Sequence, residues 1–272
     1  MMNWKQLISA KRFGMEEFHE ERQENRSEFQ RDYDRLIFSA PFRRLQNKTQ
    51  VFPLPGSVFV HNRLTHSLEV ASVGRSLGDD VAKALLERHP ELQDSFLPEI
   101  GSIVSAACLA HDLGNPPFGH SGEKAISTFF SEGKGVRLKE KQPNGEQLSP
   151  MEWEDLIHFE GNANAFRILT HQFEGRRKGG FVLTYTTLAS IVKYPFSSSL
   201  AGTKSKFGFF VSEEESFRKI ATELGLILLN EHPLKYARHP LVYLVEAADD
   251  ICYQMMDIEA VSYTHLTLPT IA

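Results

Sequence analysis

The chain has 272 residues, of which 41% are hydrophobic and 24% charged, and its 30 Lys and Arg against 35 Asp and Glu give a formal net charge of −5. This composition is that of an ordinary globular protein with a large core, and the charge argues against a broad basic surface for duplex DNA. Two cysteines without a C-x-x-C pair suit a reducing compartment, and no apolar run approaches the ~20 residues of a membrane span. The N-terminus has no signal-peptide core, so we expect a cytoplasmic protein without a membrane partner.

The first third of the chain combines helical and β-prone patterns. Apolar residues recur at helical intervals over residues 15–47. Residues 49–61 contain two short β-prone runs around the turn Pro53-Leu-Pro-Gly56, which predicts a small β-hairpin or loop. A helix is predicted over residues 65–87 and ends before Pro90.

The rest of the chain is predicted to be helical with two polar interruptions. Residues 100–113 are nearly all apolar, which is typical of a central buried helix, and Gly114-Asn-Pro-Pro-Phe-Gly119 ends it. A helix is expected from about Ser121, an exposed loop over 132–150, and further helices over 160–173, 185–193, 213–230 and 240–259. A short strand pair is predicted near 205–211, and the overall pattern is all-α.

The last residues differ in character from the helix before them. Val261-Ser-Tyr-Thr-His-Leu-Thr-Leu-Pro-Thr-Ile-Ala272 brings β-branched residues and a proline, and no Gly or Asn cap follows Glu259. A native strand-like terminus and a junction with foreign sequence both account for this change. The string resembles translated sequencing-adapter read-through, so we expect one domain over residues 1–259, truncated at its C-terminus, and a non-native tail over 260–272.

Histidines and aspartates occur within three apolar helical segments. His111-Asp112 ends the most apolar run, His66 lies one turn into the preceding helix, and Asp249-Asp250 lies in a later one. An ionised carboxylate there is costly unless a cation compensates it. A bare His-Asp pair also serves to cap a turn, so capping and metal binding both stay open. Imidazole and carboxylate ligands from separate helices suit Mn²⁺, Fe²⁺, Co²⁺, Ni²⁺, Zn²⁺ or hydrated Mg²⁺, with positions left for water and substrate.

His120 and Glu123 follow the Pro-Pro turn and are three residues apart at a predicted helix start. At this spacing the carboxylate can orient the imidazole and raise its basicity. A capping interaction would use the same spacing, so the sequence pattern alone favours neither role.

The order H…HD…D resembles the signature of the HD superfamily of metal-dependent phosphohydrolases. Longer strings are similar to the deoxyguanosine-triphosphate triphosphohydrolase-like (dNTPase) family, namely Phe42-Arg-Arg-Leu-Gln-Asn-Lys-Thr-Gln-Val51, His61-Asn-Arg-Leu-Thr-His-Ser-Leu-Glu69, His111-Asp-Leu-Gly-Asn-Pro-Pro-Phe-Gly-His120, Phe159-Glu-Gly-Asn-Ala163 and Glu246-Ala-Ala-Asp-Asp-Ile-Cys-Tyr253. The resemblance implies an all-α HD-domain helical fold. It also implies hydrolysis of dGTP-like deoxynucleoside triphosphates at the α-phosphorus, giving deoxynucleoside and tripolyphosphate.

The resemblance also implies roles for individual residues. The metal ligands would be His66, His111, Asp112 and Asp249, with Mn²⁺ or Mg²⁺ as the expected ion. Asp249 is favoured because Tyr253 and Asp257 follow it at i+4 and i+8 on one helix face, as in the family, whereas Asp250 points about 100° away and is expected to form a salt bridge or cap. His120 and Glu123 would act near the scissile phosphorus. Substrate contacts are implied for Gln50, Arg63, His158, Lys193, Tyr194, Tyr253 and Asp257.

Two alternative functions stay open at this point. Another HD phosphohydrolase, such as a nucleotidase or a signalling-nucleotide phosphodiesterase, would use the same metal site, but the matches at Gln50, Tyr253 and Asp257 argue against it. A catalytically weak nucleotide-binding protein is less consistent with an intact ligand set. The expected partners are a deoxynucleoside triphosphate and, in the full-length protein, further copies of the chain; single-stranded nucleic acid stays open as another partner.

Overall fold

The computed structural model describes residues 2–17, 26–48, 62–142, 145–175, 178–202 and 205–265, with side chains described to Met256. The α-helices are α1 (Trp4–Leu7), α2 (Glu28–Ile37), α3 (Ala40–Arg44), α4 (Arg63–Arg88), α5 (Ile100–Ala110), α6 (His120–Ser131), α7 (Pro150–Ile157), α8 (Gly161–Thr170), α9 (Tyr185–Ile191), α10 (Glu214–Glu223) and α11 (Val242–His265). Short 3₁₀ helices occupy Leu45–Asn47, Pro90–Leu92, Leu97–Glu99, Lys134–Lys139, Ser198–Leu200 and Val211–Glu213. The sheet within these ranges is one antiparallel pair, β1 (Leu228–Asn230) and β2 (Lys235–Tyr236), with Leu228 opposite Tyr236. The fold is therefore the all-α architecture that the sequence predicts.

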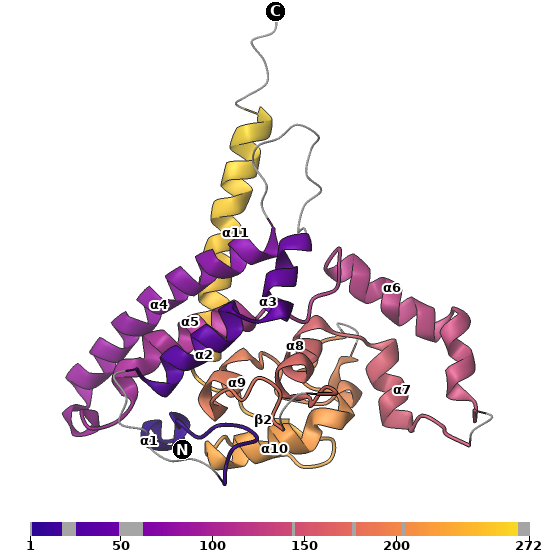
Figure 1. Ribbon diagram of the computed structural model, residues 1–272, viewed down its shortest axis with the longest axis horizontal. Coiled ribbons are helices and arrows are strands. Elements are labelled where there is room, and N and C mark those ends of the chain that lie inside the picture. Colours follow the sequence, from indigo (N-terminus) through magenta and orange to yellow (C-terminus); the bar gives the residue numbers. More distant parts are fainter. Residues whose placement is uncertain are drawn as a thin grey trace, which may run out of the picture.

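Helix α5 is the centre of the molecule. All of its residues from Ile100 to Ala110 are buried, as expected of a helix that is apolar on every side. Helices α2, α4, α9 and α11 pack around it, and Figure 1 shows it enclosed between α4 and α2. A residue that follows α5 directly is therefore held at a fixed position in the core.

Helices α4 and α5 run antiparallel and approach each other closely. A Cβ atom on Gly78 would lie 2.7 Å from Cα of Gly101, so this crossing requires glycine. The opposite end of the pair brings together the start of α4 and the end of α5, where the rings of His66 and His111 have centroids 5.5 Å apart. The first two predicted metal ligands meet at this end.

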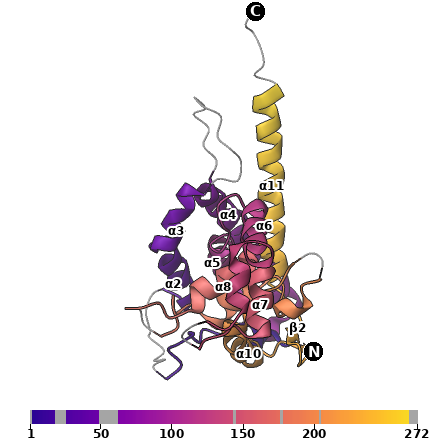
Figure 2. The ribbon, with the colours of Figure 1, turned by 90° about the vertical axis from the view of Figure 1, so that its right-hand side faces the viewer.

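Helix α11 crosses the same end and then extends beyond the rest of the molecule (Figures 1 and 2). Its start is fixed by buried His239, whose Nε2 donates to the carbonyl of Leu7 at 3.1 Å and whose Nδ1 accepts from the amide of Leu241 at 3.2 Å. These bonds tie the beginning of α11 to the N-terminal segment. None of the described helices has the length and hydropathy that crossing a membrane requires.

Most predicted helices are confirmed, with shifts at their ends. The helix expected over 65–87 is α4, and the run 100–113 forms α5 with a turn after Ala110. Within the predicted loop 132–150 the chain forms the 3₁₀ helix Lys134–Lys139. The helix expected over 213–230 ends at Glu223, and α11 continues through His265 rather than ending at 259.

The two predictions of β structure have different outcomes. The hairpin expected over 49–61 lies outside the described residues. The strand pair near 205–211 is wrong, because the described part of that segment is irregular. Phe207 and Phe209 are both buried there, and so is Gly208 between them, whose amide donates to the carbonyl of Phe196 at 3.1 Å. Residues 207–209 are therefore a continuously buried, irregular segment and not a half-buried strand.

Candidate active site

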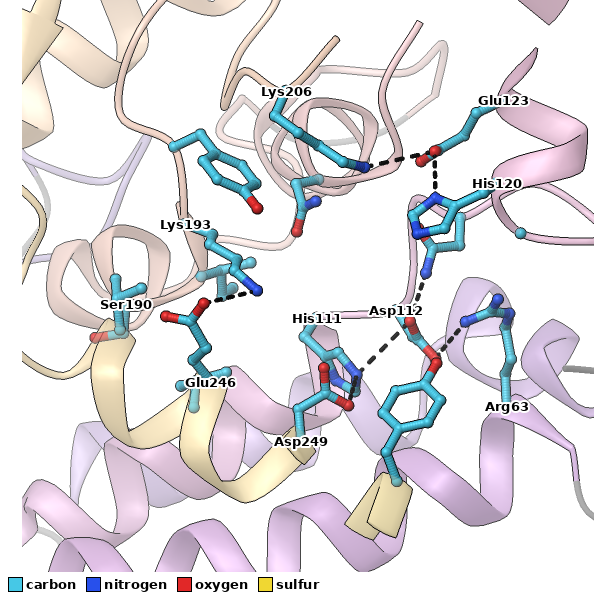
Figure 3. A pocket seen from close by; sticks show the side chains of 18 residues that line it. Arg63, His111, Asp112, His120, Glu123, Ser190, Lys193, Lys206, Glu246 and Asp249 are labelled. Carbon is cyan, nitrogen blue, oxygen red and sulfur yellow. Dashed lines mark hydrogen bonds and ion pairs between the residues drawn. The ribbon is translucent and has the colours of Figure 1, made fainter. Parts of the chain in front are cut away.

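A cavity of about 310 Å³ opens where α4, α5, α6, α8, α9 and α11 converge (Figure 3). Its volume lies at the lower end of the range for small-molecule sites. Its charged and aromatic lining comprises Arg63, His111, Asp112, His120, Glu123, Lys193, Tyr194, Lys206, Glu246, Asp249 and Tyr253. Most of the predicted site residues thus meet in one place.

His66, His111 and Asp112 form a compact group of potential metal ligands. Each offers one ligand atom, and these atoms lie within 4.8 Å of one another. His66 is fully buried and Asp112 nearly so. The three come from the first turn of α4 and the end of α5, which the close helix crossing places side by side.

Asp249 joins this group from α11. Its Oδ1 lies 3.0 Å from Nε2 of His66 and 3.6 Å from Nε2 of His111. Asp250, one residue later, is exposed. The geometry thus agrees with the helix-face argument that selects Asp249, and Figure 3 shows its carboxylate facing His111.

The ring of His111 is oriented for binding a cation. Its Nδ1 donates to the carbonyl of Cys108 at 2.6 Å, while Nε2 is buried and, among the described residues, has no hydrogen-bond partner. Carboxylate oxygens of Asp112 and Asp249 each lie 3.6 Å from that Nε2. Burial lowers the pKa of His111, but the negative charges of Asp112 and Asp249 outweigh it and raise the pKa to about 9. A divalent ion would replace this proton, so the residues present suit a metal.

The histidines have the converse effect on Asp249. Burial raises its pKa, but the adjacent rings of His111 and His66, whose Nε2 atoms lie 3.6 and 3.0 Å from its Oδ1, lower it well below its ordinary value. Asp249 is therefore held as a carboxylate, the form that binds metals.

His120 and Glu123 make the contact that their spacing predicts. Nδ1 of His120 lies 2.7 Å from Oε2 of Glu123, and the other oxygen of Glu123 accepts from the amide of Gly161 at 2.8 Å. Burial raises the pKa of Glu123, but these bonds and the charge of Lys206, 3.6 Å away, lower it. The His120 side chain is 84% exposed, with Nε2 available to the cavity.

The turn between His111 and His120 is fixed from two sides. Nζ of Lys48 donates to the carbonyls of Leu113 and Asn115 at 3.2 and 2.7 Å. A Cβ atom on Gly114 would lie 2.0 Å from the carbonyl oxygen of Gly161, so the turn rests directly on the start of α8. Metal ligands and the His120 pair are therefore held at a constant separation.

Arg63 and Tyr253 border the metal group on the side of α4. An Arg63 guanidinium nitrogen lies 2.7 Å from Oδ2 of Asp112. The Tyr253 ring packs 4.9 Å from that of His66, centroid to centroid. Burial and the charges of Asp112 and Asp249 raise the pKa of Tyr253 to about 12, so its hydroxyl stays neutral.

Lys193 and Tyr194 line the opposite side of the cavity, just after α9. Nζ of Lys193 pairs with Oε1 of Glu246 at 2.8 Å. Burial lowers the pKa of Lys193, but its hydrogen bond to Glu246 outweighs this and raises it. The lysine is therefore a permanent cation facing the cavity.

One predicted residue lies away from the described cavity lining, and the side chains of two others are not described. His158 is absent from the lining among the described residues, and its nitrogens lie 3.1 Å from Oγ of Ser205 and 3.3 Å from a carboxylate oxygen of Glu154. Gln50 lies outside the described residues. Asp257 lies on α11, four residues after Tyr253, but its side chain is not described. Their roles stay predictions.

Two charged residues in the cavity were missed by sequence reasoning. Lys206, at the end of a polar stretch, pairs with buried Glu160 at 2.8 Å and with Glu123 at 3.6 Å. Glu246 pairs with Lys193. Both glutamates that Lys206 contacts stand in or beside the strings quoted above, but only the tertiary structure joins them to a lysine from a distant loop.

The chain is similar to known proteins over most of its length. The family model described as "HD domain" matches residues 63–177. The chain is 46% identical, over 95% of its length, to a deoxyguanosinetriphosphate triphosphohydrolase-like protein of Synechocystis sp. and covers 59% of that protein. It is 47% identical to a protein of the same description from Pseudomonas aeruginosa (95% of this chain, 57% of that one) and 37% identical to the deoxyguanosinetriphosphate triphosphohydrolase of Yersinia enterocolitica (95% and 54%). The chain thus spans little more than half the length of these relatives.

Proposed function

The chain belongs to the deoxyguanosinetriphosphate triphosphohydrolase-like family of HD-domain phosphohydrolases, and from this premise we propose that it hydrolyses deoxynucleoside triphosphates to deoxynucleoside and tripolyphosphate. In this reaction water attacks the α-phosphorus, the bond from that phosphorus to the 5′ oxygen breaks, and the 5′ oxygen takes up a proton. The observation that carries the proposal is the convergence of a His-His-Asp group and Asp249 on a cavity that also presents His120 and Lys193.

His66, His111, Asp112 and Asp249 would hold a divalent ion, with Mn²⁺ or Mg²⁺ as the proposed metal. When bound, the ion supplies Lewis-acid polarisation of a phosphoryl oxygen and lowers the pKa of water. The buried Nε2 of His111, which lies between two carboxylates, supports this assignment.

His120 would accept a proton from the attacking water at Nε2. Its Nδ1 is held by Glu123, which fixes the tautomer and stabilises the imidazolium that forms. Glu123 is itself held by the amide of Gly161. The pair is thus already oriented before substrate binds, and this reduces the cost of reaching the transition state.

Cationic side chains would neutralise the triphosphate. Lys193 and Lys206 face the cavity from one side and Arg63 from the other. Tyr253 would pack against the sugar, where a ring close to C2′ leaves little room for a 2′-hydroxyl. This packing gives the preference for deoxynucleotides a steric basis.

The test is turnover of each of the four dNTPs by the purified protein with Mn²⁺, with products separated by anion-exchange chromatography. Deoxynucleoside and tripolyphosphate in equal amounts are expected. Release of phosphate or pyrophosphate would indicate another HD phosphohydrolase activity. Tight nucleotide binding without turnover would indicate a nucleotide-binding protein.

A further inference from the structure

Four carboxylates line the cavity among the described residues, and one of them has no part in the proposed reaction. Asp112 and Asp249 belong to the metal group, and Glu123 holds His120. The fourth is Glu246, on α11 one turn before Asp249. A fixed negative charge in a site for a polyanion opposes binding unless it has another task.

Glu246 bridges two cations that come from different parts of the chain. Its Oε1 lies 2.8 Å from Nζ of Lys193, and its Oε2 lies 3.2 Å from a guanidinium nitrogen of Arg238. Its side chain is 27% exposed, so the bridge is at the cavity wall and open to exchange. Figure 3 shows the Glu246 carboxylate directed at Lys193 beside it.

Arg238 is held by contacts that do not depend on Lys193. Its guanidinium lies 5.6 Å from the ring centroids of both Tyr194 and Tyr243, within the range of cation–π attraction. It precedes α11 and is absent from the described cavity lining. Arg238 can therefore stay paired with Glu246 when Lys193 forms an ion pair with another group.

We propose that Glu246 occupies the place of a phosphate group in the substrate-free protein and exchanges partners on binding. The arriving polyphosphate forms an ion pair with Lys193, and Glu246 stays paired with Arg238 alone. Glu246 is then a specificity-determining residue, because a ligand must carry enough negative charge at this end to displace it. Arg238 acts only through Glu246 and is a positioning residue. This inference rests on the proposed function, since it assumes that Lys193 meets the polyphosphate.

Two consequences follow from this exchange. A nucleoside or nucleoside monophosphate gains little from Lys193, because it lacks the charge that releases the lysine from Glu246. Tripolyphosphate as a product is bound less tightly than an unpaired Lys193 would bind it, because Glu246 competes for Lys193 as the product departs. The Glu246–Lys193 ion pair therefore affects both the discrimination between ligands of different charge and the release of tripolyphosphate.

The test is calorimetric titration of inorganic tripolyphosphate into the protein, with a fixed excess of Mg²⁺ over tripolyphosphate in every experiment. Glu246→Gln keeps the shape of the side chain and removes its charge, and it should bind tripolyphosphate about fivefold more tightly, the factor expected when a partly exposed ion pair no longer has to be broken. Arg238→Met should bind it about threefold more weakly, because Glu246 then pairs with Lys193 alone. The double variant should match Glu246→Gln, because Arg238 has no other route to the ligand.

Glu231→Gln is the matched control. Glu231 pairs with Arg218 at 2.8 Å on an exposed surface, so its substitution makes the same change in net charge away from the cavity and should leave tripolyphosphate binding unchanged. Unchanged or weaker binding by Glu246→Gln would overturn the exchange, and a double variant weaker than Glu246→Gln would show that Arg238 contacts the polyphosphate itself. If Lys193→Met weakens binding while Glu246→Gln has no effect, the proposed function stands and this inference falls. If the wild-type protein does not bind tripolyphosphate at all, this inference falls, while turnover of the dNTPs still decides the proposed function.

Discussion

Protonation of His239 should make the protein less stable below neutral pH by a predictable amount. The ring is fully buried, and its two nitrogens bond to the Leu7 carbonyl and the Leu241 amide. Burial lowers its pKa from 6.5 to about 4, which the hydrogen bond to Leu7 only partly opposes. This difference corresponds to about 3 kcal/mol between the neutral and the charged ring.

The sign follows from where protons bind. Below pH 6.5 the unfolded chain binds a proton at His239, whereas the folded protein does not bind it until the pH falls to about 4. The free energy of unfolding must therefore fall as the pH is lowered through this window. For a single site with these two pKa values, about 2 kcal/mol of the loss occurs between pH 7 and pH 5.

The assay is urea unfolding followed by circular dichroism between pH 5 and pH 8, on the wild-type protein and His239→Gln. Glutamine can donate to the Leu7 carbonyl but cannot titrate. The variant should be less stable at pH 8, because the Leu241 amide loses its acceptor, and the gap between the two proteins should narrow by about 2 kcal/mol at pH 5. Other titrating groups are common to both proteins and cancel in the difference. A gap that stays constant with pH would refute a neutral, buried His239 and with it the account of how α11 is anchored.

Three further outcomes are expected from single substitutions. Asp249→Asn should lose bound Mn²⁺ in metal analysis, while Asp250→Asn, which removes an exposed carboxylate next to it, should keep the metal; the reverse result would move the ligand to the other helix face. His120→Ala should retain Mn²⁺ and nucleotide affinity but lose about 10²–10⁴ in turnover, and adding Glu123→Ala should cost little more, because the two work as a unit; a loss of metal would instead make His120 a ligand. Gly114→Ala should lower the free energy of unfolding by about 1–3 kcal/mol in urea titrations, because its Cβ would lie 2.0 Å from a backbone oxygen; an unchanged midpoint would mean that the turn can shift away from α8.

Local patterns in the sequence determine much of the fold and the metal group. Burial on every side of residues 100–110 follows from their composition, and a helix with that pattern has to be central. The choice of Asp249 over Asp250 follows from helical periodicity, because residues four apart share a face and adjacent ones do not. The His120–Glu123 contact likewise depends on a separation of three residues within one turn. All these relations join residues that are close in the sequence, so they can be predicted from the sequence alone.

Other features were decided only by tertiary structure. Lys206 reaches Glu123 and Glu160 from a polar stretch that has no pattern of its own, and Glu246 meets Lys193 from a separate helix. Phe207 and Phe209 are buried without forming a strand, because Phe207 packs in a cluster with Phe196 while Phe209 stacks on Phe217 in the main core. The physical reason is the same in each case. An ion pair or a packing contact between distant segments depends on how the backbone places those segments in space. The local sequence around either residue has no periodicity that predicts the contact.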